Sequence, residues 1–276
     1  MPSNAARPRA LVIRAAGTNC DAEMCRAFEM AGASVSLVHV DRLIADPKQI
    51  DDFDLIGFPG GFSYGDDIAS GRILAMKLRE KLYPALRDAA KRGCPMIGAC
   101  NGFQVLVQVG LLPGPAAGEE WPTDAAPIQT ASLAHNSGGR FIDKWVRVQP
   151  NADSNCIWTK GLAEAFPSAQ SEIMQLPIAH GEGRFSTSSP AVLDALKANG
   201  QIALTYIENP NSSEADIAGI CDPSGRIFGL MPHPERYLDW TRHPFWTRLS
   251  DSTRTGPTPG LMMFQNAVRA VERINA

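Results

Sequence analysis

Three short apolar runs in the N-terminal part of the chain are each followed by a turn and then by a helical pattern. The runs span residues 10–14, 54–58 and 95–99, and residues 34–40 alternate in the manner of a further strand. Strands that alternate with helices along a sequence form parallel sheets. We therefore expect an α/β fold with an open, largely parallel, twisted sheet and flanking helices. The helices are expected at residues 68–78, 80–92 and 101–109, and from residue 259 onward.

The C-terminal half is richer in strand patterns. Residues 217–221 and 226–231 flank an Asp-Pro-Ser-Gly turn, which predicts an antiparallel hairpin. Extra antiparallel strands are expected in this half, at residues 140–148, 172–178 and 201–207. The sequence shows no interdomain linker, so we expect residues 1–276 to form a single domain, with residues 1–8 disordered.

The composition limits the classes of protein that need to be considered. Hydrophobic residues make up 44% of the 276 residues and charged residues 20%, which is typical of a globular chain with a sizeable core. A formal net charge of −3 gives no electrostatic basis for binding nucleic acid. No run approaches the roughly 18 apolar residues of a membrane span, and residues 1–10 lack the apolar core of a signal peptide. We expect a cytoplasmic protein without nucleic-acid or membrane partners.

One of the six cysteines lies in a motif with a chemical meaning. The six are scattered without a paired CxxC spacing, so we expect free thiols and no metal or disulfide. Cys100 is the central residue of Gly-Ala-Cys-Asn-Gly at residues 98–102, where a strand pattern gives way to a helical one. This is the cysteine counterpart of the serine elbow in hydrolases of the α/β type. The motif makes Cys100 a candidate nucleophile.

Elementary physical chemistry explains why the elbow suits a nucleophile. The turn is so sharp that side chains at the two glycine positions would collide with backbone, and the strained residue between them projects outward. A cysteine at the start of a helix also faces a partial positive charge, which favours the thiolate. By the motif alone, Cys100 could also be a small buried structural residue. Cys20, which begins another helical pattern, is the nearest rival but lacks the glycine pair.

A nucleophile that attacks a carbonyl needs donors for the oxyanion that forms. The backbone N–H of Asn101 is expected to point into the same space as the thiol of Cys100. The Pro-Gly-Gly turn at residues 59–61 follows a neighbouring strand, and its bare backbone can approach a substrate closely. We take Gly61 and Asn101 as the two oxyanion donors.

The base is sought among five histidines. His233 is held between two prolines at the end of a strand, and in an extended segment Glu235 would project the same way and orient the imidazole. This arrangement suggests a triad of Cys100, His233 and Glu235. Taken alone, the His-Pro-Glu segment could also be a loop with a surface ion pair. Packing most simply explains His39 and His243. His135 and His180 are expected in polar, glycine-containing loops, the second at residues 180–185, where substrate contact or plain surface placement is possible.

Several longer segments resemble one family closely. They read Gly-Gly-Phe-Ser-Tyr-Gly-Asp at residues 60–66, Gly-Ala-Cys-Asn-Gly-Phe-Gln at 98–104, Ala-His-Gly-Glu-Gly-Arg-Phe at 179–185 and Met-Pro-His-Pro-Glu-Arg at 231–236. Together with Gly-Thr-Asn-Cys-Asp at residues 17–21, they resemble the glutamine amidotransferase subunits of phosphoribosylformylglycinamidine synthase, which are of the class I, triad type. The resemblance covers nearly the whole chain.

The resemblance implies a reaction and further site residues. It implies a subunit that hydrolyses glutamine to glutamate and ammonia through a cysteine thioester, and a synthetase partner that uses the ammonia and ATP to convert formylglycinamide ribonucleotide to formylglycinamidine ribonucleotide in purine biosynthesis. It also implies that Gln104, His180, Gly181 and Arg184 help to bind glutamine. Arg184 suits a carboxylate, although a simple salt bridge explains it equally well.

Partners and rivals follow from what the sequence lacks. The Gly-Lys-Ser/Thr ending of a phosphate-binding loop is missing after Gly60, so we expect no cofactor in this chain and place ATP and Mg on the synthetase. In the family a small accessory subunit can complete the complex. Residues 112–127 and 237–258 depart from the compact family pattern and leave the interface geometry open. The rival interpretations are a cysteine hydrolase or protease with a similar elbow, and a non-catalytic regulatory subunit.

Overall fold

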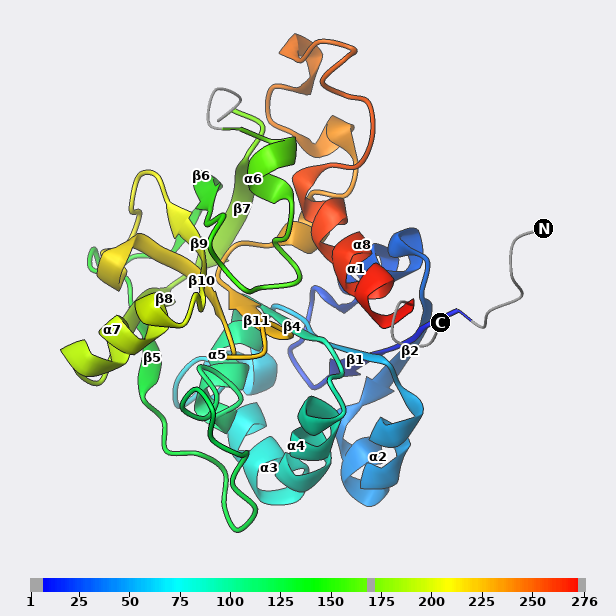
Figure 1. Cartoon of the computed structure of the whole chain (residues 1–276), viewed down its shortest axis with the longest axis vertical. Helices are drawn as coiled ribbons and strands as arrows, with labels where there is room; N and C mark the ends of the chain where they lie inside the picture. The colour runs from blue at the N-terminus through cyan, green and yellow to red at the C-terminus, as the bar shows by residue number, and fades with distance from the viewer. Residues whose placement is uncertain (1–6, 168–171, 273–276) are drawn as a thin grey trace.

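A nine-stranded sheet runs through the molecule (Figure 1). The structure is a computed structural model that describes residues 7–167 and 172–272. Disorder is expected from the sequence at residues 1–8, and residues 1–6 of that range lie outside the described part. In spatial order the strands are β2 (Ser34–His39), β1 (Arg9–Arg14), β3 (Leu55–Phe58), β4 (Met96–Ala99), β11 (Ile227–Leu230), β10 (Ile217–Cys221), β9 (Ile202–Tyr206), β6 (Ile142–Pro150) and β7 (Gln175–His180).

The sheet changes from parallel to antiparallel part of the way across. The five strands from β2 to β11 are parallel to one another. Beyond β11, each neighbouring pair through β10, β9, β6 and β7 is antiparallel. The expected fold class, a largely parallel α/β sheet with antiparallel strands added in the C-terminal half, is confirmed. The hairpin predicted around the Asp-Pro-Ser-Gly turn is the β10–β11 pair.

Helices cover both faces of the parallel part of the sheet. The strands have apolar side chains on both faces, as β1 shows, and each face must be shielded from water. Ala10 and Val12 pack on one face, and Leu11 and Ile13 pack on the other. On the first face, α1 (Asp21–Ala31) and α8 (Pro259–Glu272) lie side by side, with the rings of Phe28 and Phe264 5.1 Å apart (Figure 1). The second face is covered by α2 (Val40–Ala45), α3 (Arg72–Lys81), α4 (Tyr83–Lys91) and α5 (Asn101–Val109).

Two expectations about local structure need correction. Helix α3 begins at Arg72 and not at residue 68, because Gly71 adopts a left-handed conformation and a 3-10 turn occupies Ser63–Asp66. Residues 180–185 are not a loop: His180 ends β7, and the chain then enters β8 (Glu182–Thr187). Strand β8 pairs with β5 (Ala131–His135) in a small two-stranded sheet. The remaining short helices are α6 (Leu162–Ala165) and α7 (Pro190–Ala198).

Three chain segments meet at the carboxyl edge of the parallel strands. Strand β4 lies between β3 and β11 and is parallel to both. The glycine turn at residues 59–61 follows β3, Cys100 follows β4, and the His233 segment follows β11. This edge is where open α/β sheets place their reactive groups. Across residues 7–167 and 172–272, no helix has both the length and the apolar character that crossing a bilayer requires.

Candidate active site

Cys100 occupies a strained turn between β4 and α5. Its φ of 51° and ψ of −107° are unusual for a residue with a side chain, and its own N–H donates to the Leu230 carbonyl at 2.8 Å. The flanking glycines make the turn possible. A Cβ at Gly98 would lie 2.6 Å from the backbone of Gly102, and one at Gly102 would overlap the carbonyl of Phe58. The sharp strand-to-helix turn expected around Cys100 is therefore present, with the geometry that the two glycines permit.

The sulfur of Cys100 lies in a narrow space between the sheet and the β7 end. Only 5% of the residue is exposed, and its thiol donates to the carbonyl of Ala179 at 3.5 Å. Nε2 of His233 is buried and has no hydrogen-bond partner among the described residues. The Cys100 sulfur nevertheless raises the pKa of the imidazole, so the two groups lie close enough to act on each other.

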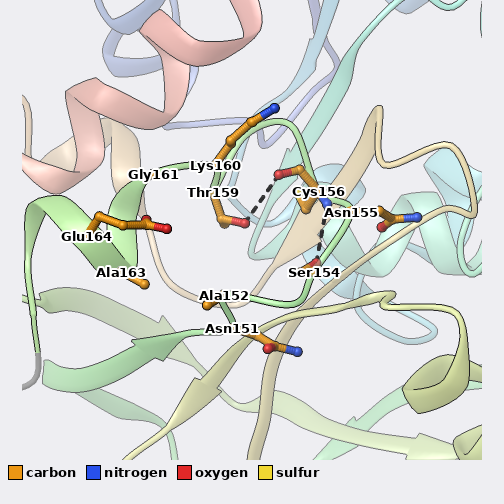
Figure 2. Close-up of a pocket in the computed structure, with 10 residues that line it drawn as sticks. All are labelled: Asn151, Ala152, Ser154, Asn155, Cys156, Thr159, Lys160, Gly161, Ala163 and Glu164. Carbon is orange, nitrogen blue, oxygen red and sulfur yellow. Dashed lines mark hydrogen bonds between the residues drawn. The ribbon is translucent and has the colours of Figure 1, made fainter.

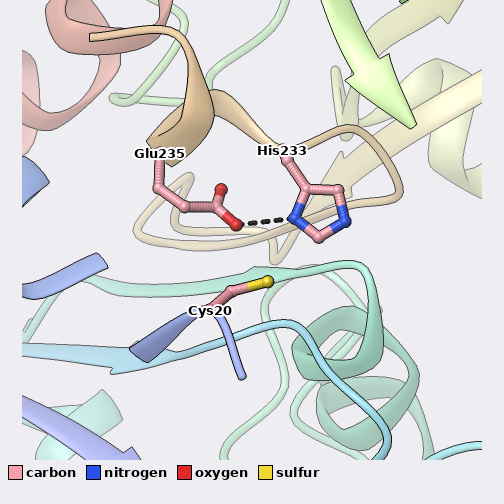
Figure 3. A group of neighbouring side chains, drawn as sticks. All are labelled: Cys20, His233 and Glu235. Atoms are coloured by element: carbon pink, nitrogen blue, oxygen red, sulfur yellow. Dashed lines mark hydrogen bonds and ion pairs between the residues drawn. The ribbon is translucent and has the colours of Figure 1, made fainter. Parts of the chain in front are cut away.

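His233 and Glu235 form a buried hydrogen-bonded pair. Nδ1 of His233 lies 2.6 Å from Oε1 of Glu235, and the two side chains are 2% and 0% exposed (Figure 3). The backbone differs from the expectation, because residues Pro234–Arg236 form a 3-10 turn and not an extended segment. The close pairing of the two side chains was predicted, and a tight turn brings it about. Because Glu235 accepts from Nδ1, Nε2 is the ring nitrogen left to face Cys100.

Several charges act on the imidazole of His233. Burial lowers the pKa of His233, but Glu235, the thiolate form of Cys100 and the Cys20 sulfur all raise it, and the net pKa is well above its ordinary value. A proton on this ring is therefore stabilised chiefly by the Glu235 carboxylate. A protonated imidazole beside the Cys100 thiol can serve as the acid that a cysteine nucleophile needs.

The two predicted oxyanion donors flank the elbow. Asn101 is the first residue of α5, so its N–H has no partner within the helix. Gly61 has a φ of 143°, and a Cβ on it would lie 2.7 Å from the backbone nitrogen of Asn19. The hydrogen bonds that hold the glycine turn are donated by Cys20 to the Gly60 carbonyl at 3.2 Å and by Phe62 to the Gly17 carbonyl at 2.9 Å. These contacts fix the turn without using the N–H of Gly61.

Side chains of the helix N-terminus hold the neighbouring loop. The Nδ2 group of Asn101 donates to Asp66 at 3.2 Å and to Gln104 at 3.0 Å. Burial raises the pKa of Asp66, and its carboxylate also accepts from the backbone of Gly71 at 3.2 Å. Gln104 is 3% exposed and donates to the carbonyl of Glu182. In this state Gln104 therefore links α5 to β8, and its amide nitrogen already has a partner.

His180 lies beside the triad and not in an exposed loop. It is 2% exposed, and its Nδ1 lies 3.0 Å from Oδ1 of Asn136. Nδ2 of Asn136 donates to the carbonyls of Arg140 and His180, so its oxygen faces the ring and Nδ1 of His180 carries the hydrogen. Burial and the nearby charge of His233 lower the pKa of His180 to about 4. The ring is neutral near pH 7, and its buried Nε2 is an acceptor without a hydrogen-bond partner among the residues that the structure describes.

The other two predicted glutamine contacts differ in their surroundings. Gly181 follows His180, and its carbonyl accepts from the Asn136 N–H at 2.9 Å. Arg184 is exposed on β8, where it pairs in register with Ala134. No feature of the sequence indicates the contacts made by Asn136 or by the Ala179 carbonyl. The carbonyl of Ala179 acts through backbone geometry, which carries no residue-type signal, and Asn136 lies in a turn-like stretch where an asparagine is ordinary.

Two further groups of residues have features of a site. A cavity of about 230 Å³ is lined by the segment from Asn151 to Glu164 (Figure 2). Its wall is held by local hydrogen bonds such as Thr159 to the Cys156 carbonyl, and none of the predicted site residues lines it. The second group is Cys20, whose sulfur lies within 4.8 Å of a ring nitrogen of His233 and a carboxylate oxygen of Glu235. The rival cysteine is therefore part of the same site.

Comparison with known proteins agrees with this fold. A family model described as a CobB/CobQ-like glutamine amidotransferase domain matches residues 7–271. A solved structure described as PurLQS from Thermotoga maritima is similar with a TM-score of 0.67 and 33% identity, covering 96% of this chain and 99% of the other. A glutamine amidotransferase structure from the same organism, at 15% identity and a TM-score of 0.50, covers 97% of this chain and 99% of its own and shares the fold. The class is thus that of the glutamine amidotransferases.

Curated relatives narrow the class further. The phosphoribosylformylglycinamidine synthase subunit PurQ of Dehalococcoides mccartyi is 38% identical over 273 residues, which cover 96% of this chain and 98% of the relative. The subunit of the same name from Treponema denticola is 42% identical over 246 residues, covering 83% and 88%. The chain belongs to the family of PurQ subunits of phosphoribosylformylglycinamidine synthase.

Proposed function

We propose that this chain hydrolyses glutamine to glutamate and ammonia and supplies the ammonia to a synthetase subunit of phosphoribosylformylglycinamidine synthase. Family membership supports this activity over a protease or a non-catalytic subunit. The observation that carries the proposal is the position of Cys100. It occupies a strained elbow at a helix N-terminus, beside a buried imidazole that is paired with Glu235 at 2.6 Å.

The chemistry follows from the order of these groups. The thiolate of Cys100 attacks the carboxamide carbon of glutamine, and the oxyanion that forms is stabilised by the N–H groups of Gly61 and Asn101. His233, as imidazolium, gives its proton to the departing nitrogen, so that the C–N bond breaks and ammonia leaves behind a thioester. The neutral imidazole then takes a proton from water, which attacks the thioester and releases glutamate and the Cys100 thiolate.

Glutamine binding is assigned to the β7–β8 segment. The free Nε2 of the neutral His180 can accept a hydrogen bond from the substrate, and the Gly181 backbone lies beside it. Arg184 is an exposed cation that suits the α-carboxylate. Gln104 can contribute only if its bond to the Glu182 carbonyl is exchanged for one to the substrate. A rearrangement of β8 on binding is one way in which such an exchange occurs.

The partner supplies the remaining chemistry. We infer that ATP, Mg and formylglycinamide ribonucleotide bind the synthetase subunit, and that this chain needs no cofactor or metal of its own for hydrolysis. A small accessory subunit is proposed to complete the complex, which operates in the cytoplasm. The name PurLQS of the similar Thermotoga maritima structure is consistent with an assembly of more than one kind of subunit.

Paired assays with the synthetase test the proposal. Cys100→Ala is expected to abolish formylglycinamidine ribonucleotide synthesis from glutamine while leaving synthesis from added ammonium salt, since the partner does not need the thiol. Cys25→Ala, which removes a half-buried thiol from α1, is the matched control and should leave both activities within about twofold. Glutamine-dependent synthesis by Cys100→Ala at the wild-type rate would refute the proposal.

A further inference from the structure

We propose that Cys20 is a positioning residue that holds the guanidinium of Arg236 away from Glu235, so that the Glu235 carboxylate stays bonded to His233. The inference rests on the proposed function, because it concerns the same triad. Cys20 is the N-cap residue of α1 and is 1% exposed. Its side chain ends beneath the hydrogen bond between His233 and Glu235 (Figure 3).

The sulfur of Cys20 anchors Arg236. Nη2 of Arg236 donates to this sulfur at 3.1 Å, and the thiol of Cys20 in turn lies 3.2 Å from Oδ1 of Asn19. Arg236 is the residue next to Glu235 in sequence, yet within the described residues no ion pair within 4.0 Å joins the two side chains. The guanidinium is therefore held at the sulfur although a carboxylate is close by.

Glu235 would be an attractive alternative partner for that guanidinium. Its Oε1 is bonded to His233, but its Oε2 is buried and has no partner in the described part of the chain. A bond from an arginine to a carboxylate is roughly twice as strong as one between neutral groups. Without the anchor at Cys20, Arg236 would gain by turning to Glu235 and would compete with the imidazole for the carboxylate charge.

The surroundings leave room for such a movement. A cavity of about 270 Å³ is lined by Glu235 and Arg236 together with Glu23, Arg26, Leu238 and Arg242. Arg26 is already paired with Asp239 at 2.8 Å. The guanidinium of Arg236 therefore has space beside it in which to move once its bond to the Cys20 sulfur is lost.

The position of Cys20 is itself fixed from two sides. Its N–H donates to the Gly60 carbonyl at 3.2 Å. A Cβ at Gly60 would lie 2.6 Å from Cε1 of His233 and 3.3 Å from the Cys20 sulfur, so the bare glycine lets the ring and the thiol approach.

The same three side chains, Cys20, His233 and Glu235, are of the types that bind Zn²⁺. The positive charge of Arg236 at the Cys20 sulfur opposes the binding of a metal cation there.

The groups that face the His233 ring define what a titration would report. Glu235 faces it from its own turn, Cys20 from the N-cap of α1, Cys100 from the N-cap of α5 and His180 from the end of β7. Of these, only Glu235 is expected to change its partner when Cys20 is replaced. If Arg236 paired with Glu235, the carboxylate would stabilise the protonated imidazole of His233 less, and the pKa of His233 would fall. The titration of His233 would then move to lower pH.

Four variants, assayed with the synthetase, test the inference: Cys20→Ala, Cys20→Ser, Arg236→Met and the double variant Cys20→Ala/Arg236→Met. Cys20→Ala is expected to lower kcat with glutamine about 10- to 100-fold, with KM changed less than about threefold and synthesis from ammonium unchanged. Serine can accept from Arg236, so Cys20→Ser should stay within about threefold of wild type. In the double variant the arginine is gone, and kcat should return to within about threefold of Arg236→Met alone.

The pH profile separates positioning from a general loss of structure. Cys20→Ala should shift the His233 limb of the kcat/KM profile to lower pH by about one unit, and the double variant should reverse the part of that shift that Arg236 causes. A double variant no faster than Cys20→Ala, a Cys20→Ala enzyme equal to wild type, or a Cys20→Ser enzyme as slow as Cys20→Ala would each overturn the inference. Failure of the proposed function itself would show differently, as wild-type and Cys100→Ala enzymes of equal glutamine-dependent activity.

Discussion

The Oε1 atom of Glu235 lies 2.6 Å from Nδ1 of His233, inside a turn that solvent does not reach. The 3-10 geometry of Pro234–Arg236 produces this closeness, and the turn is packed against the start of α8, where a Cβ on Gly260 would overlap the Pro234 carbonyl. The pair leaves Nε2 of His233 directed away from the carboxylate. Glu235 therefore sets the tautomer of His233 and favours its protonated form.

Glu235→Gln should keep the shape of this pair and remove its charge. The pKa of His233 loses its strongest supporting contribution and falls, so less imidazolium is present to protonate the departing ammonia. We expect kcat for glutamine to fall by about 10²- to 10⁴-fold with little change in KM. Steady-state glutaminase kinetics in the complex measure both. Glu208→Gln, at an exposed ion pair with Arg147, is the matched control and should change kcat less than about twofold. An unchanged kcat in Glu235→Gln would contradict the assigned role.

His180 should make folding stability depend on acid pH. Its folded pKa is about 4, below the unfolded value of about 6.5, so between these pH values the unfolded chain binds a proton that the folded chain does not. The free energy of unfolding is therefore unaffected by His180 above about pH 6.5. As the pH falls from 6.5 toward 4, protonation of His180 in the unfolded chain lowers the free energy of unfolding by about 3 kcal/mol. Urea unfolding of wild type and His180→Gln across this range should give a flatter dependence for the variant. Parallel curves for the two proteins would show that His180 does not titrate as stated.

Gly102→Ala should prevent the elbow from forming. The new methyl group would overlap the carbonyl of Phe58, which is backbone and cannot move aside without displacing β3. We expect the free energy of unfolding to fall by about 3 kcal/mol or more. Gly138→Ala is the control, because a Cβ there meets nothing within 4 Å, and its effect should stay within about 0.5 kcal/mol. Equal stability of the two variants by chemical denaturation would argue against the close contact at the elbow.

Arg184→Ala tests the proposed carboxylate contact. Arg184 is exposed, so its removal should leave the unfolding free energy nearly unchanged. Loss of a charged hydrogen bond to substrate is expected to raise KM for glutamine by about 10- to 100-fold, with kcat within about threefold. Arg140→Ala, another exposed arginine in the adjoining turn, should leave KM unaltered. A KM for Arg184→Ala equal to that of wild type would remove this residue from the binding site.

The parts of the fold that the sequence predicted well are those with strong local rules. Helix α5 begins at Asn101 and ends at Val109 as expected, because the elbow starts it and Gly110, with a φ of 89°, stops it. The strands β3 and β4 were predicted from apolar runs, since a strand buried on both faces has few polar residues. The convergence of their ends followed from the parallel topology alone.

The parts that the sequence did not predict depend on contacts between distant segments. Residues 180–185 were interpreted as a loop because glycines at 181 and 183 are turn signals, yet they belong to β7 and β8. Gly183 is needed because a Cβ there would overlap the His180 ring, which is a packing constraint without a local pattern. In the same way, nothing near Cys20 in the sequence indicates that its sulfur meets Arg236 and the His233 pair.

The assignment of Cys100 as nucleophile is tested most directly by a glutamine analogue with an electrophilic side chain, followed by mass spectrometry of the peptides. Burial raises the pKa of Cys25 to about 11 and that of Cys94 to about 12, so both remain unreactive thiols near neutral pH. In the complex with the synthetase, we expect one equivalent of label, on Cys100, and complete protection by glutamine. Label on Cys20 with Cys100 unmodified would contradict it.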